Sequence, residues 1–366
     1  MRKAQGEGRR VAVAMSGGVD SSVAAVLLRD AGYDVVGVTM TLWSCHRSDR
    51  ARKQTCCSTL DVEDARAVCE RLGIPHVVAD FRTEFRAQVI QPFVEEYARA
   101  RTPIPCIGCN QHFKFDRLWS LMQQEYGAEY LATGHYARRV PTDGDGGLVM
   151  QRAADQRKDQ TYYLFIMTAA QLTHTLFPLG TLKKEEVRAI AARHGLVTAE
   201  KPESFEICFV PDNDYAGFIE DFFPEHAGHA GPLINAAGEV VGRHRGTHAY
   251  TIGQRRGIGQ GFGERRYVTA IDATGGSVTV GPREALARMS LTASTFNWLT
   301  PAPSVGTVMQ ATAKIRAQHT PAACTARVCD TGDIQVEFCE PQYAVTPGQA
   351  VVLYDHETVL GGGWIA

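Results

Sequence analysis

Val11-Ala12-Val13-Ala14-Met15-Ser16-Gly17-Gly18-Val19-Asp20-Ser21-Ser22 is the stretch that decides the fold of this chain. Its apolar first half, built from small and β-branched residues, is typical of a buried strand. Residues 19–31 are rich in Ala, Val and Leu and predict a helix that ends at Gly32. The turn between them aims backbone N–H groups and the positive end of the helix dipole at one point, and such a turn binds phosphate.

The residues around these glycines indicate which kind of phosphate-binding turn this is. No Lys follows them, so this is not the P-loop of the common nucleotide-binding proteins. Three hydroxyls and the carboxylate of Asp20 crowd the turn instead. Any strand-to-helix connection needs a turn, but Ser-Gly-Gly-Val-Asp-Ser-Ser at 16–22 is far more specific. It resembles the PP-loop of ATP pyrophosphatases, which release pyrophosphate and leave an adenylated substrate.

Length and composition limit the number of domains, the kind of partner and the state of the cysteines. A chain of 366 residues is expected to form two or three domains. A formal net charge of −2 means that any nucleic-acid site must be a local basic patch. We find no secretory signal and no apolar run as long as a membrane span, and therefore expect a soluble, cytoplasmic protein with no membrane partner. The ten cysteines are expected to be mostly free thiols.

The rhythm of the first half predicts an α/β fold with a doubly wound parallel sheet. Strands are expected at 35–41 and 74–80, a strand with its C-terminal loop at 130–136, and helices at 61–72, 85–101, 113–126, 171–177 and 183–194. Ligands of such sheets lie beyond the carboxyl ends of the strands. Met40, at the end of the second strand, is therefore a plausible contact to adenine, although a lone Met more often packs in a core.

From about residue 228 the pattern changes to short β runs separated by turns. We divide the chain into a catalytic domain at 1–215, a small β-rich central domain at 216–285 and a C-terminal β-barrel at 286–366. The expected strands are 233–238, 240–243, 248–252, 267–272 and 277–281 in the central domain, and 305–315, 324–329, 334–338, 350–354 and 358–365 in the barrel.

Two groups of residues outside the glycine turn could carry chemistry. Cys106 and Cys109 follow Pro103 and Pro105, which favour a stiff loop. The pair fits half of a zinc site, a redox dithiol or a catalytic thiol near a nucleotide, and the residues alone leave these alternatives open. Basic, amide and aromatic residues at 152–163, together with basic clusters in the β-rich parts, suggest an RNA backbone as partner.

In combination, these motifs resemble the tRNA-specific 2-thiouridylases, a family of PP-loop enzymes. The matching segments run nearly from end to end of the chain. They are residues 15–22, 39–40, 57–65, 109–115, 132–138, 158–162, 177–180, 199–209, 250–257 and 347–349.

The resemblance implies a sulfurtransferase that replaces the C2 oxygen of the wobble uridine of tRNA with sulfur. The C2 oxygen attacks the α-phosphate of ATP, pyrophosphate leaves, and the base becomes an adenylate. The implied ATP site is Ala14, Met15, Ser16, Gly17, Gly18, Val19, Asp20, Ser21, Met40 and Gly134. Mg²⁺ would accompany ATP; the sequence indicates no metal held by protein side chains and no permanent cofactor.

Two cysteines have implied catalytic roles. Cys208 matches the residue that carries a persulfide from a cysteine desulfurase or sulfur-relay protein, and Cys109 matches the nucleophile that releases this sulfur and ends in a disulfide with Cys208. The apolar residues next to it in the sequence, taken alone, indicate that Cys208 is a thiol packed in the core. A second thiol is what persulfide resolution requires.

The resemblance implies the tRNAs for lysine, glutamate and glutamine as substrates. It also implies a set of tRNA contacts, and this chain matches the family at only some of these positions. The positions are Ile104, Pro105, Cys106, His135, Lys158, Asp159, Gln160, Arg316, Ala317 and Gln349. The family commonly has Asn where this chain has Ile104, and some members have Asp where it has Cys106, so an acid–base role at 106 does not transfer. Ala317 replaces a more usual Tyr, which leaves Arg316 to pair with phosphate.

Two other functions compete with this reading. The glycine turn alone also fits a PP-loop synthetase that amidates a small molecule, but the two cysteines would then have no role. An RNA-binding protein with a structural Cys site is the other alternative, and the intact Ser16, Asp20 and Ser21 argue against it.

Overall fold

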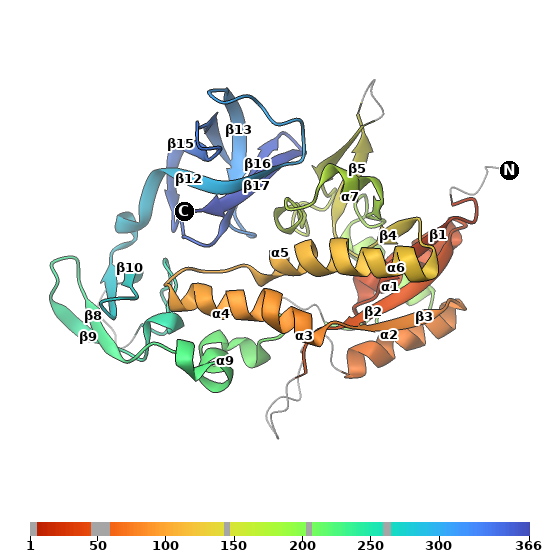
Figure 1. Ribbon diagram of the computed structural model, residues 1–366, viewed down its shortest axis with the longest axis horizontal. Helices are drawn as coiled ribbons and strands as arrows, with labels where there is room; N and C mark the ends of the chain where they lie inside the picture. The colour runs from red at the N-terminus through yellow and green to blue at the C-terminus, as the bar shows by residue number, and fades with distance from the viewer. Residues whose placement is uncertain (1–5, 45–58, 143–146, 203–206, 259–264) are drawn as a thin grey trace. The chain divides into compact units, whose positions relative to one another are not determined.

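The computed structural model describes residues 6–44, 59–142, 147–202, 207–258 and 265–366 (Figure 1). Its contacts divide the chain into two compact units. The first unit contains residues 1–88, 106–212 and 357–359, and the second contains residues 89–105, 213–356 and 360–366. No helix in the described ranges is long and apolar enough to cross a membrane.

The first unit is built on a five-stranded parallel sheet with the order β3-β2-β1-β4-β7. The strands are β1 (Arg10–Ala14), β2 (Asp34–Thr41), β3 (His76–Asp80), β4 (Tyr130–Ala132) and β7 (Thr175–Leu176). Helices α1 (Val19–Asp30), α2 (Thr59–Leu72) and α8 (Lys184–Arg193) share one apolar cluster with β1. The predicted α/β fold is therefore confirmed.

The cysteine segment differs from the prediction. The chain turns helical at Pro105 and stays so through α5 (Pro105–Cys109), a π-helical stretch (Asn110–Leu118) and α6 (Trp119–Tyr126), as Figure 1 shows. Cys106 and Cys109 thus lie in the first turns of a long helix, whereas a loop was expected up to residue 112. Proline breaks helix interiors but suits a first helical position, where its missing N–H would have no partner.

Other element boundaries also differ from the prediction. The helix expected at 85–101 is α3 (Arg82–Phe85), a π turn (Arg86–Ile90) and α4 (Gln91–Ala98). The helix expected at 171–177 is wrong: α7 (Ala169–Thr173), begun by a capping box of Thr168 and Gln171, ends early, and the chain becomes β7. The strands β5 (Ala137–Pro141) and β6 (Leu148–Arg152) pair as a hairpin. The run Asp-Gly-Asp-Gly-Gly at 143–147 between them is typical of a hairpin turn, and residues 143–146 lie outside the described residues.

The second unit contains two β structures. Its small sheet has the order β10-β11-β8-β9, from β8 (Gly231–Ile234), β9 (Val240–His244), β10 (Tyr267–Asp272) and β11 (Ser277–Gly281). Helix α9 (Tyr215–Phe222) precedes it. The strand expected at 248–252 is wrong, because buried His248 accepts the Gly228 N–H (2.9 Å) and bonds Glu220 (3.1 Å), which holds this segment in a turn.

The other structure is a closed six-stranded antiparallel barrel. Its strands are β12 (Ala287–Trp298), β13 (Val308–Lys314), β14 (Ala322–Val328), β15 (Ile334–Tyr343), β16 (Ala350–Asp355) and β17 (Thr358–Ile365). Sequence reasoning missed β12, which closes the barrel against β17. Two irregularities interrupt its pairing, between Arg288 and Ser290 and between Ser294 and Asn297, and they remove the period-two pattern that marks a strand.

Candidate active site

The loop between β1 and α1 is held in shape by its own hydroxyl groups. Ser21 Oγ accepts the N–H of Ser16 (3.1 Å) and donates to the carbonyl of Gly18 (3.1 Å), and Ser22 Oγ donates to the same carbonyl (2.8 Å). Gly18 is the N-cap of α1, which places the free N–H groups of the helix at this loop. The loop therefore has the form of an anion-binding turn.

Two glycines allow close backbone approaches to this loop. Gly17 has a φ of +68°, and a Cβ at this position would lie 2.8 Å from the Cα of Asp61 in α2. A Cβ on Gly134, just after β4, would lie 2.7 Å from the N of Ser21. Since β1 pairs with both β2 and β4, Met40 and Gly134 flank the loop. The structure thus brings together the residues predicted for ATP.

The carboxylate of Asp20, in the first turn of α1, is bound by two groups from distant parts of the chain. The Tyr136 hydroxyl donates to it at 2.8 Å, and the Lys184 ammonium lies 2.7 and 2.8 Å from its two oxygens. Lys184 is itself buried. Sequence reasoning missed Tyr136 and Lys184, because nothing in their local pattern indicates a partner more than a hundred residues away.

Lys201 holds the other side of the loop. Its ammonium donates to the carbonyl of Gly17 (2.9 Å) and pairs with Asp61 (2.7 Å) and Asp64 (2.5 Å) in α2. Partial burial lowers the pKa of Lys201, but the hydrogen bonds to the two carboxylates outweigh this and the pKa is raised. The residue is therefore a permanent cation that ties α2 to the loop.

Replacing Lys201 with Met is expected to loosen this loop. Two half-buried carboxylates and the Gly17 carbonyl would lose their cation. We expect a loss of about 1–3 kcal/mol in the free energy of unfolding and weaker ATP binding. Denaturant titration and calorimetric ATP titration measure the two effects. Lys201→Arg, which keeps the charge, serves as control, and unchanged ATP affinity in Lys201→Met would contradict the assignment.

The segments that carry Cys109 and Cys208 both contact the ring of Phe85. Phe113, one turn after Cys109, packs on Phe85 at 5.3 Å between ring centroids, and Phe209 packs on the same ring at 5.8 Å. Cys109 is buried and Cys208 is half-buried, and both are free thiols. The helix of one cysteine and the segment of the other therefore meet through Phe85.

Cys106 differs from Cys109, although the two lie in one helix. Cys106 is exposed at the surface. Many protein atoms nevertheless surround its sulfur, and this desolvation raises the pKa of the Cys106 thiol; the Cys109 thiol raises it further, and Lys114 opposes both. Its thiol form is favoured at neutral pH, which makes it a poor nucleophile. Among the described residues, no group of three or more His, Cys, Asp or Glu side chains is arranged to hold a metal ion.

Of the residues expected to contact tRNA in the first unit, two are engaged in shaping a turn. The buried Asp159 carboxylate accepts hydrogen bonds from Thr161 Oγ1 (2.9 Å) and from the Ala153 N–H (3.2 Å). Gln160 Oε1 accepts the N–H of Tyr136 (3.0 Å). Burial and the neighbouring Lys114 hold the pKa of His135 well below its ordinary value, so this ring is neutral at pH 7. Lys158 is half-exposed.

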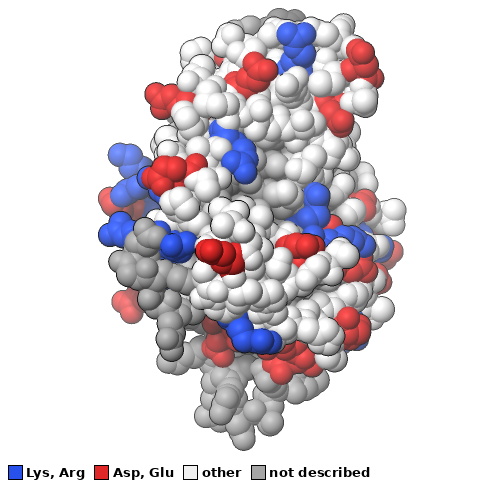
Figure 2. Space-filling model, turned by 90° about the vertical axis from the view of Figure 1, so that its left-hand side faces the viewer, with Lys and Arg blue, Asp and Glu red and all other residues white. Residues whose placement is uncertain are grey.

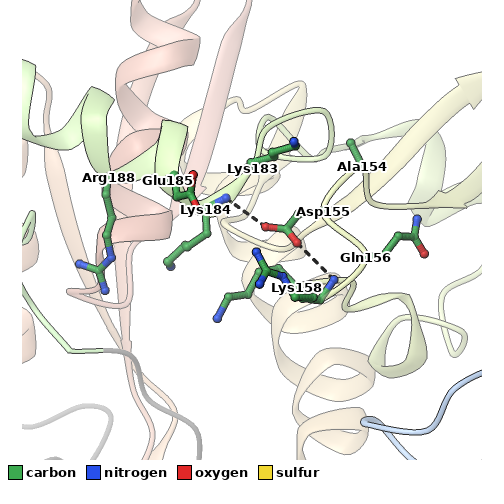
Figure 3. Close-up of a pocket in the computed structure, with 9 residues that line it drawn as sticks. Ala154, Asp155, Gln156, Lys158, Lys183, Lys184, Glu185 and Arg188 are labelled. Atoms are coloured by element: carbon green, nitrogen blue, oxygen red, sulfur yellow. Dashed lines mark hydrogen bonds between the residues drawn. The ribbon is translucent and has the colours of Figure 1, made fainter.

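A groove of about 710 Å³ lies beside this turn (Figure 3). Five of its lining side chains are cationic and two are acidic; the lining is Ala154, Asp155, Gln156, Arg157, Lys158, Lys183, Lys184, Glu185 and Arg188. Asp155 is occupied by the backbone N–H groups of Arg157 (3.2 Å) and Lys184 (3.1 Å). Within the described ranges, Arg157 and Lys183 form no ion pair. The groove therefore has cationic groups available for an anion, and sequence reasoning had singled out only part of it.

The remaining predicted contacts lie in the second unit. Exposed Arg316 follows β13 and donates to the carbonyl of Tyr343 (3.0 Å), with Ala317 beside it. Gln349 lies in the turn before β16, Ile104 immediately precedes α5, and Pro105 is the first residue of α5. On the face shown in Figure 2, Lys and Arg side chains are interspersed with Asp and Glu among neutral residues. The cationic side chains visible there therefore form small, separate groups.

Comparison with known proteins covers nearly the whole chain. Three family models match: "tRNA methyl transferase HUP domain" at residues 9–212, "tRNA methyl transferase PRC-barrel domain" at 216–282 and "Aminomethyltransferase beta-barrel domain" at 288–365. The tRNA-specific 2-thiouridylase MnmA of Geotalea uraniireducens (strain Rf4) is 48% identical over 98% of this chain and 95% of its own length. That of Geobacter metallireducens is 47% identical, over 98% and 96%. The chain therefore belongs to the tRNA-specific 2-thiouridylase family.

Proposed function

We propose that this protein is a tRNA-uridine 2-sulfurtransferase, which uses ATP to convert the wobble uridine of tRNA to 2-thiouridine. The observation that carries the proposal is the union, in one compact unit, of an anion-binding turn with two cysteine segments that share the Phe85 ring. The family membership supports the same chemistry. ATP is the activating substrate, and Mg²⁺ enters with it.

The first step is adenylation at the β1–α1 loop. The C2 oxygen of uridine attacks the α-phosphate of ATP, the C2–O–P bond forms, and pyrophosphate leaves with the electrons of the broken P–O bond. The N–H groups at the start of α1 stabilise the negative charge on the phosphates. Lys184 and Tyr136 keep the Asp20 carboxylate in place, so that it does not turn toward these anions.

The second step transfers sulfur. The Cys109 thiolate attacks the inner sulfur of a Cys208 persulfide, a Cys109–Cys208 disulfide forms, and hydrosulfide leaves with the bonding pair. Hydrosulfide adds to C2, and AMP departs as C2 becomes a thiocarbonyl. A cytoplasmic thiol reductant then restores both cysteines. A cysteine desulfurase or sulfur-relay protein supplies the persulfide.

Thiolation of unmodified tRNA tests this proposal. The purified protein is incubated with ATP, a persulfide donor and the tRNAs for lysine, glutamate or glutamine, and the nucleosides are analysed by mass spectrometry. We expect 2-thiouridine at the wobble position, with one AMP and one pyrophosphate per sulfur. Pyrophosphate release that responds to a small carboxylic acid and not to tRNA would favour an amidating synthetase instead.

The groove beside Lys158 is expected to hold part of the tRNA backbone. Replacing Arg157 or Lys183 with Ala removes one available cation from its lining. Each change is expected to weaken tRNA binding by roughly 3- to 10-fold and to reduce the slope of log K against log salt by about one. Filter binding at several salt concentrations measures both quantities. Arg193→Ala, at the far end of α8 and outside the groove lining, is the control, and equal salt slopes in all variants would contradict the assignment.

A further inference from the structure

The backbone of Thr102 is bound on both sides by one loop of the barrel. Thr102 lies just before residues 104–106, which the family resemblance matches to the loop that meets the target base of the tRNA. The N–H of Thr102 donates to the carbonyl of Pro347 (2.9 Å), and Gln349 Nε2 donates to the carbonyl of Thr102 (3.0 Å). Both partners belong to the second unit. The loop formed by residues 347–349 thus holds Thr102 as a neighbouring strand would.

Gly348 makes this contact possible. Its φ is +86°, and a Cβ at this position would lie 2.9 Å from the N of Thr102 and 3.1 Å from the Cβ of Arg101. The loop is itself anchored to β17, because the Gly348 N–H donates to the carbonyl of Ile365 (3.1 Å) and the Ile365 N–H to the carbonyl of Gln349 (2.8 Å). The barrel therefore presents a rigid edge to Thr102.

The residues on either side of Thr102 are also restricted, so the position of Thr102 sets that of the residues after it. Arg101 pairs with Glu96 in α4 (2.7 Å) and donates to the carbonyl of Ile365 (3.3 Å). After Thr102, the rings of Pro103 and Pro105 fix two of the next three φ angles. A chain restricted in this way has little freedom to absorb a shift at Thr102, so the direction of Ile104 follows from where Thr102 is held.

We propose that Gln349 is a positioning residue, whose amide holds Thr102 so that Ile104 and Pro105 meet the uridine in a set orientation. The inference rests on the proposed function and deepens it. The resemblance implied for Gln349 only a contact to RNA. Its Nε2 is instead occupied by the carbonyl of Thr102.

The kinetic test uses Gln349→Ala and Gln349→Glu. Both lose the N–H donor, and the carboxylate of the second would face the Thr102 carbonyl. We expect kcat for thiolation to fall ~10-fold, and more for Gln349→Glu, while the Kd for tRNA stays within about twofold. Gln310→Ala is the matched control, because Gln310 also donates through its amide within the barrel, to Thr325 (3.2 Å). A raised Kd with unchanged kcat would overturn the proposal and leave Gln349 a simple RNA contact.

A second readout needs no activity. Amide hydrogen exchange at Thr102 in the free protein is expected to be slow in the wild type and in Gln310→Ala, and ~10-fold faster in Gln349→Ala. Equal exchange in all three proteins would overturn the positioning role. A wild-type protein that makes no 2-thiouridine would instead overturn the proposed function, and the exchange result would still report on the contact.

Discussion

Thiolation is expected to be abolished by Cys208→Ser and by Cys109→Ser, while both variants continue to release pyrophosphate in the presence of tRNA. A serine hydroxyl cannot carry a persulfide or attack one, so the rate of 2-thiouridine formation should fall by at least ~10³-fold. Adenylation depends on the β1–α1 loop and not on sulfur chemistry, so it should proceed in both variants. Mass spectrometry of the tRNA and a coupled pyrophosphate assay separate the two steps.

Cys106→Ser is the matched control, because Cys106 lies one turn before Cys109 in the same helix. Its exposed thiol, with a raised pKa, has no part in the proposed transfer, and the variant should thiolate at close to the wild-type rate. If Cys106→Ser loses activity while Cys109→Ser keeps it, the roles of the two residues are exchanged. Loss of pyrophosphate release in Cys208→Ser would contradict the separation of the two steps.

The parts of the fold that sequence reasoning predicted are those with strong local patterns. Strands β1 and β2 are rich in small and β-branched apolar residues, and α1 and α2 are followed by glycines with positive φ, Gly32 and Gly73. The errors arise where tertiary contacts decide. Strand β7 has two residues and exists only because it pairs with β4, and no periodicity is readable over that length.

The candidate site shows the same division. The glycine turn is a local motif, so its residues were found together. Tyr136, Lys184 and Lys201 form hydrogen bonds to this loop from 116, 164 and 184 positions away. Nothing in the local sequence around these three residues indicates such a distant partner. The contact of Gln349 with Thr102 spans 247 positions and uses backbone groups, which no side-chain pattern reports.

Gly17→Ala is expected to lower the rate of tRNA-dependent pyrophosphate release by ~10²-fold or more. The φ of +68° costs an Ala about 1–2 kcal/mol, and the added methyl group would press on the backbone of Asp61, which cannot rotate away as a side chain would. Either the loop or the start of α2 must move, and the N–H groups would no longer converge on the phosphates. The pyrophosphate assay and calorimetric ATP titration measure the loss.

Gly73→Ala separates this effect from backbone strain. Gly73 has nearly the same φ, +67°, and no atom lies within 4 Å of the position where its Cβ would be. Both variants bear the same conformational cost, so Gly73→Ala should lose roughly 1 kcal/mol of unfolding free energy and Gly17→Ala at least as much. Gly73→Ala should nevertheless bind ATP as the wild type does, because its methyl group points into open space. Equal losses of ATP affinity in the two variants would mean that strain, and not the approach of Asp61 to the loop, limits binding.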